Sequence, residues 1–275
     1  MHPLISAAEL RPLIESGVPL LVLDCRFSLQ DPEAGARAFA EGHIPDAVYA
    51  HLNRDLSAPL TGKNGRHPLP TLDTFAATLK SWGLSPDTQV VAYDDQGGMF
   101  AARAWWMLHW AGHHAVQVLD GGWKAWLNDI DDAPERGAPT APEARSFAPV
   151  LVAEVLQHLN QRDHMQLLDA RAPDRFRGEN ETLDPVGGHI PGAINRFFQL
   201  NLQADGHFAE PAVLRNAFEA LLAGQDPRTV VHQCGSGVTA CHNLLAMEVA
   251  GLRGSRLYAG SWSEWCADAS RPVAT

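Results

Sequence analysis

Residues 42–47 read Gly-His-Ile-Pro-Asp-Ala, and residues 188–193 read Gly-His-Ile-Pro-Gly-Ala, 146 positions later. Further matched segments accompany this pair at similar intervals and in the same order. They are 8–10 with 153–155, 22–26 with 167–171, 90–91 with 230–231, and 121–126 with 260–265. The interval far exceeds the roughly 20–50 residues of solenoid repeats. We therefore interpret the chain as a duplicated domain.

The composition is that of an ordinary globular protein. The chain has 275 residues, 45% hydrophobic and 19% charged, with a formal net charge of −11. Such a chain can bury a sizeable core without disulfide staples. Its acidity is poorly suited to nucleic acid or to an anionic membrane surface. An anionic substrate would therefore need a local positive site.

The cysteines and the first residues indicate a compartment. The four cysteines form no Cys-x-x-Cys pair, which argues against zinc ribbons and thioredoxin-like dithiols. Residues 1–6 lack the basic and apolar segments of a secretory signal. No apolar run reaches the roughly 18 residues that a membrane span requires. We expect free thiols and a cytoplasmic location.

Both halves alternate apolar runs with helical patterns. The runs lie at 20–24, 89–93, 116–119, 166–169 and 229–232. This alternation predicts βαβ units, and hence an α/β fold with a parallel sheet flanked by helices in each half. A proline-rich stretch with little apolar content separates the halves. We predict domains at 1–135 and 150–275, joined by a linker at 136–149.

One loop carries the predicted chemistry. Cys234 directly follows a strand pattern, and residues 235–239 read Gly-Ser-Gly-Val-Thr before a helical pattern. Ligands of parallel sheets bind at the carboxyl ends of strands. The two glycines let successive N–H groups converge, and the helix N-terminus adds positive potential. Both features favour an ionised thiol, so Cys234 is the predicted nucleophile.

The matching loop of the first half differs. Residues 94–100 read Asp-Asp-Gln-Gly-Gly-Met-Phe and contain no thiol. We expect the second copy to be catalytic and the first to lend surface, with Met99 and Phe100 as candidates for an apolar wall. The segment after Cys234 predicts a helix with one buried face, formed by Cys241, Leu244, Leu245 and Val249. Gly251 is expected to close this helix.

These motifs together resemble the tandem-domain rhodanese family of sulfurtransferases. The resemblance rests on the paired Gly-His-Ile-Pro and Asp-x-Arg segments and on the loop at 234–239, and it covers nearly the whole chain. It implies two tandem rhodanese-like domains, an inactive copy followed by a catalytic one. The loop is similar to that of 3-mercaptopyruvate sulfurtransferases, whereas thiosulfate-preferring relatives carry basic residues within it.

The resemblance implies an activity and its machinery. A sulfane sulfur would pass from 3-mercaptopyruvate, a small anionic donor, to a thiol, cyanide or thioredoxin-like acceptor through a Cys234 persulfide. No metal or organic cofactor is implied. Ser236 would hydrogen-bond the donor carbonyl or the leaving group. The amides that would hold the sulfur anion belong to Gly235, Gly237, Val238 and Thr239.

The family also implies arginines that hold the donor carboxylate. Arg175 matches the first such position, and a guanidinium can bind a carboxylate through two parallel hydrogen bonds. A second family arginine is absent, because residues 179–187 contain no cation. Either Arg171, Arg177 or Arg196 replaces it, or the donor binds differently. Thiosulfate therefore remains an alternative donor.

Other interpretations of the same residues are weaker. A cysteine phosphatase would need an arginine where Ala240 stands. A non-enzymatic sulfur carrier or redox sensor stays open, although Cys241 lies on the helix and is poorly placed as a resolving thiol. His109 and His113 have a spacing that is only a weak metal-ligand signal. His67 lies on a predicted loop and is a further candidate to line the site.

Overall fold

The computed structural model describes residues 1–128, 147–159 and 161–275, which form two compact units. The first unit comprises Met1–Ala58, Pro70–Ala144 and Leu202–Glu210. The second comprises Pro59–Leu69, Arg145–Asn201 and Pro211–Thr275. Each half of the sequence thus gives a short segment to the unit formed mainly by the other half, which the repeat did not predict.

The predicted linker at 136–149 falls mostly on residues 129–146, which lie outside the described part of the chain. The boundaries at 135 and 150 therefore stay predictions. Among the described helices, none combines the length and the apolar character that a bilayer span requires.

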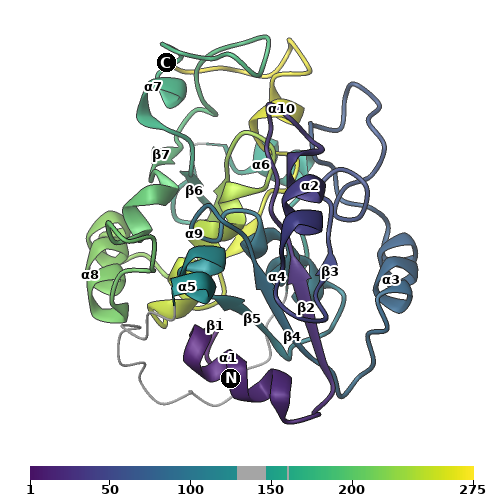
Figure 1. Ribbon diagram of the computed structural model, residues 1–275. Coiled ribbons are helices and arrows are strands. Elements are labelled where there is room, and N and C mark those ends of the chain that lie inside the picture. Colours follow the sequence, from purple (N-terminus) through teal and green to yellow (C-terminus); the bar gives the residue numbers. More distant parts are fainter. Residues whose placement is uncertain (129–146, 160) are drawn as a thin grey trace. The chain divides into compact units, whose positions relative to one another are not determined.

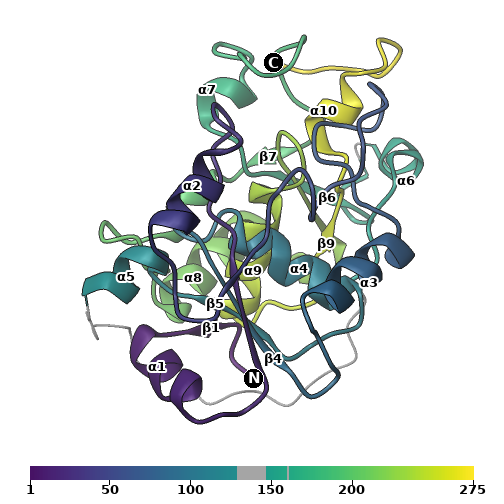
Figure 2. The same ribbon diagram turned by 45° about the vertical axis from the view of Figure 1, so that its right-hand side comes forward.

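The first unit is built on a parallel sheet with the strand order β1-β5-β4-β2-β3 (Figure 1). Its strands are β1 (Leu4–Ile5), β2 (Leu20–Asp24), β3 (Val48–Tyr49), β4 (Gln89–Tyr93) and β5 (Val116–Leu119). Its helices are α1 (Ala7–Glu15), α2 (Ala34–Glu41), α3 (Leu72–Ser81), α4 (Ala101–Trp110) and α5 (Gly122–Asn128). Strands β2 and β4 pair along their whole length, and α4 packs on β4 and β5 (Figure 2).

The second unit repeats this plan with a parallel sheet of order β7-β6-β8-β9. Its strands are β6 (Gln166–Asp169), β7 (Ile194–Asn195), β8 (Val230–Gln233) and β9 (Arg256–Leu257). Its helical elements are α6 (Val152–Gln157), α7 (Pro173–Phe176), η1 (Phe198–Asn201), α8 (Pro211–Leu222), η2 (Pro227–Thr229), α9 (Thr239–Val249) and α10 (Ser261–Trp265). The order matches β3-β2-β4-β5 of the first unit, which confirms the predicted duplicated α/β fold.

The repeated Gly-His-Ile-Pro segments have the same structural role in both units. Ile44 and Ile190 are completely buried. The Nδ1 atoms of His43 and His189 lie 2.8 and 2.9 Å from carbonyl oxygens of the helix that precedes each segment. These contacts fix each segment beneath its helix, which explains why the motif recurs.

The repeated Asp-x-Arg pairs brace the same region. Arg26 lies 2.6 Å from Asp24, and Arg171 lies 2.7 Å from Asp169, with all four side chains almost fully buried. Each arginine also donates to the carbonyl oxygen of the glycine that opens the Gly-His-Ile-Pro segment of its unit. A buried ion pair with additional hydrogen bonds avoids leaving an uncompensated charge.

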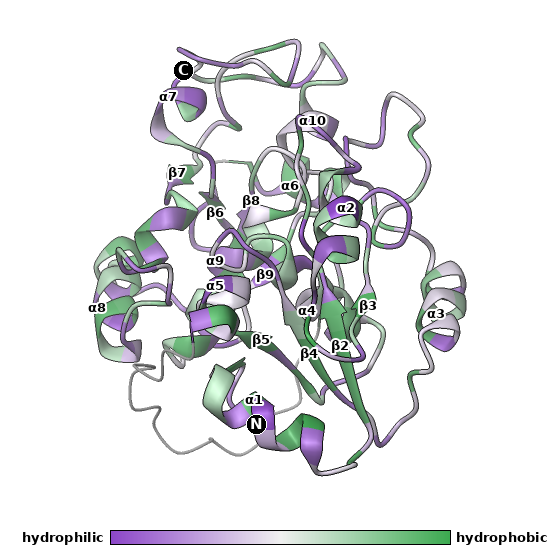
Figure 3. Ribbon diagram, in the orientation of Figure 1, coloured by the Kyte–Doolittle hydropathy of each residue, from purple (hydrophilic) through white to green (hydrophobic). Residues whose placement is uncertain are grey.

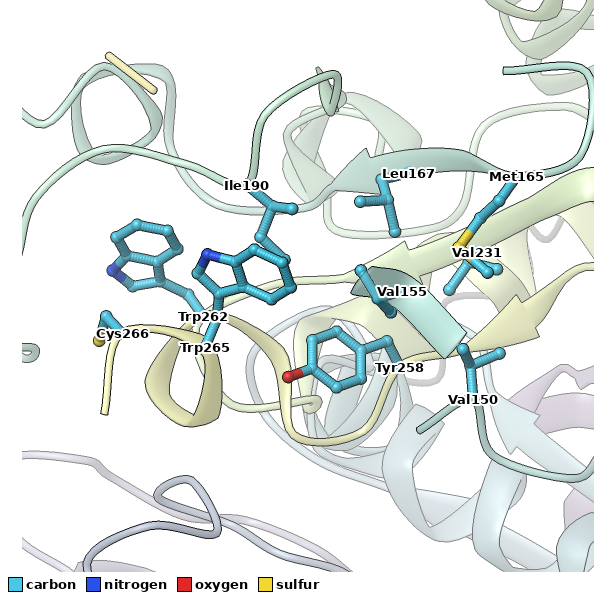
Figure 4. Packing of buried hydrophobic residues seen from close by; sticks show 10 residues of the cluster. All are labelled: Val150, Val155, Met165, Leu167, Ile190, Val231, Tyr258, Trp262, Trp265 and Cys266. Atoms are coloured by element: carbon cyan, nitrogen blue, oxygen red, sulfur yellow. The ribbon is translucent and has the colours of Figure 1, made fainter. Parts of the chain in front are cut away.

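Apolar side chains fill the space around both sheets. Strands β2 and β4 are predominantly hydrophobic (Figure 3), as expected for strands covered on both faces. In the second unit, Trp262 and Trp265 of α10 pack with apolar residues from the sheet (Figure 4). The cluster comprises Val150, Val155, Met165, Leu167, Ile190, Val231, Tyr258, Trp262, Trp265 and Cys266. This core holds α10 beside the carboxyl end of β8.

Helix α9 corrects one prediction. We expected one buried face, but every residue from position 240 to 249 is buried. Polar side chains of the helix have buried partners from another segment, because Asn201 Nδ2 donates to Asn243 Oδ1 at 2.7 Å and lies 3.2 Å from His242 Nδ1. Gly251, with a φ of 72°, closes the helix as predicted. The fully buried helix gives the loop before it a rigid support.

Candidate active site

Cys234 lies where the sequence placed it, directly after β8 and five residues before the start of α9. The residue is buried, with 2% of its surface exposed. Its N–H donates to Ser261 Oγ at 3.1 Å, and its carbonyl oxygen accepts from the Trp262 N–H at 3.0 Å. The start of α10 therefore fixes the cysteine backbone on both sides.

Ser261 is a residue that the sequence prediction missed. Its φ of 54° lies in the left-handed region, which is uncommon for a residue other than glycine. Gly122 occupies the matching position of the first unit with a φ of 55°. The serine hydroxyl both accepts from Cys234 and donates to the Tyr258 carbonyl oxygen at 2.9 Å. Strained residues cluster at functional sites, and the change from Gly-Gly-Trp to Gly-Ser-Trp was the available signal.

The loop after Cys234 contains open hydrogen-bond donors. Within the described residues, the backbone N–H groups of Gly235, Ser236 and Val238 have no hydrogen-bond acceptor, although all three residues are buried. Buried N–H groups are paired in the great majority of cases. Gly237 has a φ of 76°, and an added Cβ there would overlap the Ala259 carbonyl oxygen. A buried loop with unpaired donors is suited to an anion.

In the matching loop of the first unit, an aspartate side chain accepts the hydrogen bonds of the loop N–H groups. Asp94 follows β4 as Cys234 follows β8. Its carboxylate accepts N–H bonds from Gln96, Gly98 and Phe100 at 2.8 Å and from Ala101 at 2.9 Å. Burial raises the pKa of Asp94 above its ordinary value, and the four donors oppose that rise. An aspartate side chain thus occupies the amide cradle of the copy that lacks a thiol.

His67 and Ser236 are brought together in the second unit. The His67 Nδ1 and Ser236 Oγ atoms lie 2.7 Å apart, within hydrogen-bond distance, and both residues are buried. His67 belongs to the segment Pro59–Leu69, which groups with the second unit. An imidazole in this place can orient a hydroxyl or exchange a proton with it.

Two arginines approach the loop at Gly235. A Cβ atom built on this glycine would lie 2.7 Å from Arg66 Nη2, 3.5 Å from Arg175 Nη2 and 3.7 Å from Arg175 Nη1. Arg175 was predicted here, whereas Arg66 was missed. Two features of the sequence could have indicated Arg66. It is adjacent to His67, which was a candidate for the site, and residues 179–187 lack the second arginine that the resemblance implies.

Carboxylates hold these arginines from the other side. Arg66 pairs with Asp184, and Arg175 pairs with Glu181 at 2.8 Å. Burial raises the pKa of Glu181, but hydrogen bonds from the Leu183 N–H and from Arg175 bring it below its ordinary value. The ionised form of Glu181 is therefore favoured, as an anchor for Arg175 requires.

Among the three arginines proposed as substitutes, Arg171 lies close to the site, because its Nη1 atom is 3.5 Å from Glu181, the carboxylate that also pairs with Arg175. Arg177 is half-exposed and pairs with Glu179 at 2.6 Å. Arg196 Nη2 donates to the carbonyl oxygen of Leu200 and to Asn201. Burial lowers the pKa of Arg171, but Asp169 and Glu181 raise it above its ordinary value, with a smaller contribution from Cys234. None of the three is among the atoms nearest to Gly235.

The other candidate residues lie in the first unit. Met99 and Phe100 belong to the first unit, where Phe100 is buried against Phe27 at a ring distance of 5.5 Å. Their role as an apolar wall stays a prediction. His109 and His114 bring their Nδ1 atoms within 2.9 Å of each other. Among the described residues, no group of three or more His, Cys, Asp or Glu side chains is arranged to hold a metal ion.

The other three cysteines are also buried. Burial raises the pKa of Cys25 well above its ordinary value, and nearby aspartates add to the rise. Burial likewise raises the pKa of Cys266 to about 11. Cys241 is completely buried, and its Sγ lies 3.3 Å from the Gly237 carbonyl oxygen. These environments disfavour the thiolate at Cys25 and Cys266.

Comparisons with known proteins agree with this architecture. A family profile described as "Rhodanese-like domain" matches residues 6–129 and 151–268. Over 262 residues the chain is 52% identical to a probable 3-mercaptopyruvate sulfurtransferase of Pseudomonas aeruginosa, covering 93% of this chain and 92% of that one. It is 35% identical over 263 residues to the thiosulfate sulfurtransferase of Bos taurus, covering 90% and 86%. The crystal structure of SseA from Escherichia coli, presented as a rhodanese fold of 3-mercaptopyruvate sulfotransferases, aligns with a TM-score of 0.77 at 31% identity, covering 95% and 99%.

Proposed function

The chain belongs to the rhodanese-like family and is a sulfurtransferase, and from this premise we propose that it takes sulfur from 3-mercaptopyruvate through a persulfide on Cys234. A sulfurtransferase requires a sulfur donor and an acceptor such as a thiol or cyanide. The loop at 234–238 is the proposed catalytic site. The observation that carries the proposal is the set of buried N–H groups at Gly235, Ser236 and Val238 for which the described residues offer no acceptor.

The first step forms the persulfide. The Cys234 thiolate attacks the donor sulfur, so that an S–S bond forms as the C–S bond breaks. The electron pair of the C–S bond leaves as the enolate of pyruvate, which then takes up a proton. Ser236 donates a hydrogen bond to the oxygen on which this charge develops, and His67, 2.7 Å away, orients the hydroxyl.

The loop amides stabilise the intermediate. The terminal sulfur of the persulfide is anionic, and the N–H groups of the loop supply hydrogen bonds to it without a charged side chain. The first unit supports this step, because the matching loop holds the Asp94 carboxylate with four N–H bonds. The two copies then differ in whether the anion is a fixed side chain or a transferable sulfur.

The second step returns the enzyme to its starting state. An acceptor thiolate, or cyanide, attacks the terminal sulfur, and the Cys234 thiolate leaves. A thioredoxin-like dithiol is the proposed protein acceptor. We place the reaction in the cytoplasm, because reducing conditions there keep thiols free and the cysteines form no disulfide in the described part of the chain.

Thiosulfate is the second candidate donor. The loop itself contains no basic residue, but Arg66 and Arg175 lie beside Gly235, where their N–H groups can donate to a thiosulfate oxygen as to a carboxylate. The measurement that separates the donors is kcat/KM for 3-mercaptopyruvate and thiosulfate at the same acceptor concentration. A higher value for 3-mercaptopyruvate supports the proposal, and a higher value for thiosulfate rejects the donor assignment.

Two substitutions and one control variant test the residue roles. Cys234→Ser should abolish turnover with both donors, whereas Cys241→Ser should retain it, since Cys241 is sealed in the helix core. Ser236→Ala should lower kcat for 3-mercaptopyruvate by about a hundredfold, the scale of one lost oxyanion donor. Full activity of Cys234→Ser would reject the proposed nucleophile.

A further inference from the structure

We propose that Arg66 is the second donor-binding cation of the site and that, with Arg175, it binds the carboxylate of the donor beside Gly235. The inference rests on the proposed function and extends it to a residue outside segment 179–187, where the resemblance places the second arginine. Arg66 comes from the segment Pro59–Leu69, which belongs to the second unit.

The position of Arg66 is fixed by its backbone and by its side chain. Its N–H donates to Ser263 Oγ at 3.0 Å, on the same helix α10 that holds Cys234. Its Nη1 atom pairs with Asp184, whose side chain is 3% exposed. The opposite end of the guanidinium, Nη2, is the atom nearest to the position where a Cβ of Gly235 would stand. The arginine is therefore held at one end and presented to the loop at the other.

Arg175 is likewise held by a carboxylate on one side of its guanidinium group. Its Nε and Nη2 atoms donate to Glu181 at 3.1 and 2.8 Å. Considering the described residues only, neither Arg66 Nη2 nor Arg175 Nη1 makes a hydrogen bond. Two donor groups on different arginines thus face the same glycine. A carboxylate has two oxygens that can each accept from one of them.

The nearby Arg66 side chain explains why position 235 is occupied by a glycine. Its φ is not among the left-handed values of the chain, so backbone conformation alone would allow another residue. An alanine methyl group would stand 2.7 Å from Arg66 Nη2, too close for both to keep their places. The absent side chain leaves the space next to Cys234 to two guanidinium groups supplied by other segments. The loop itself has no cationic side chain, and arginines from other segments supply the positive charge beside it.

Asp184 and Glu181 set the chemistry of the pair. Asp184 pairs with Arg66 and also lies 3.5 Å from Arg175 Nη2, the atom that donates to Glu181, so one carboxylate links the two arginines. These carboxylates balance most of the positive charge. Binding of a donor therefore depends on hydrogen bonds at fixed positions rather than on excess charge, which favours a planar carboxylate.

The test compares Arg66→Ala with Arg177→Ala. Arg177 is an exposed arginine of the same unit and pairs with Glu179. Arg66→Ala should raise KM for 3-mercaptopyruvate by about tenfold to a hundredfold, the scale of one hydrogen bond to a charged group, with little change in kcat. Arg66→Lys should recover part of the loss, because it keeps the charge but not the fork. Arg177→Ala should leave KM unchanged.

A second measurement does not depend on turnover. In the Cys234→Ser background, pyruvate serves as a non-reacting carboxylate probe, and calorimetry measures its dissociation constant. Arg66→Ala and Gly235→Ala should each weaken pyruvate binding by about tenfold or more, while thermal unfolding confirms that both variants fold. Gly235→Ala keeps both Arg66 and Asp184, and its methyl group competes with Arg66 Nη2 for the space beside the loop.

The outcomes separate this inference from the proposed function. A wild-type enzyme inactive with 3-mercaptopyruvate would reject the proposed donor, and the pyruvate titration would still decide the role of Arg66. An active wild-type enzyme whose KM and pyruvate affinity are unchanged by folded Arg66→Ala and Arg66→Lys would overturn the assignment of Arg66. A fall in kcat alone would also contradict it, because a donor-binding residue acts on KM.

Discussion

Asp94→Asn should destabilise the protein strongly, although it changes only one atom of the side chain. The Asp94 carboxylate is fully buried and accepts four backbone N–H bonds, two on each oxygen. An asparagine has one carbonyl oxygen, so two of the four N–H groups would face an amide NH2 in either orientation. An unsatisfied buried donor costs about 1–3 kcal/mol, which gives a loss of about 2–6 kcal/mol. This is a large part of a typical stability of about 5–15 kcal/mol.

The assay is urea unfolding of the wild-type chain, Asp94→Asn and Asp95→Asn, followed by tryptophan fluorescence. Asp95 is the adjacent aspartate but is exposed, so its substitution removes the same charge without leaving buried donors unsatisfied. We expect a clear fall in the unfolding midpoint for Asp94→Asn only. Equal midpoints for all three proteins would refute the claim that this loop is organised around an anion, and with it the internal comparison between Asp94 and Cys234.

Two further predictions concern the second unit. Gly237→Ala should sharply reduce kcat/KM in a steady-state assay, because the methyl group would overlap the Ala259 carbonyl oxygen and shift the amides next to the nucleophile; unchanged kinetics would contradict the loop geometry. Burial lowers the pKa of His232 from 6.5 to about 3, so only the unfolded chain binds this proton as the pH falls between those values. Stability should therefore fall with decreasing pH by up to about 1.4 kcal/mol per unit from this residue, and His232→Leu should show a flatter acid slope in unfolding titrations. Identical slopes for the two proteins would contradict this assignment.

The sequence predicted the fold because the duplicated motifs have structural roles. The isoleucines at 44 and 190 fill the two cores, and the paired Asp-x-Arg segments bind the glycines that open the same motifs. A residue pattern that recurs for packing reasons is visible in one chain without any relative. The place of Cys234 followed from the same alternation of strands and helices.

Other parts of the site could not be predicted, because they depend on long-range placement. Arg66 stands 169 positions before Gly235, and no spacing rule connects them. The burial of helix α9 on all sides was missed for a related reason, since Asn201 satisfies Asn243 from outside the helix. Periodicity reports which residues are apolar, whereas polar residues that find buried partners are seen only in the structure.

In the proposed mechanism, Cys234 carries the transferred sulfur. The most direct measurement is mass spectrometry of peptides from the enzyme after reaction with one equivalent of 3-mercaptopyruvate and no acceptor. We expect the peptide containing Cys234 to gain the mass of one sulfur atom, and to lose it when cyanide or a thiol is added. An unmodified Cys234 alongside pyruvate release, or a sulfur found instead on Cys25, Cys241 or Cys266, would contradict the account.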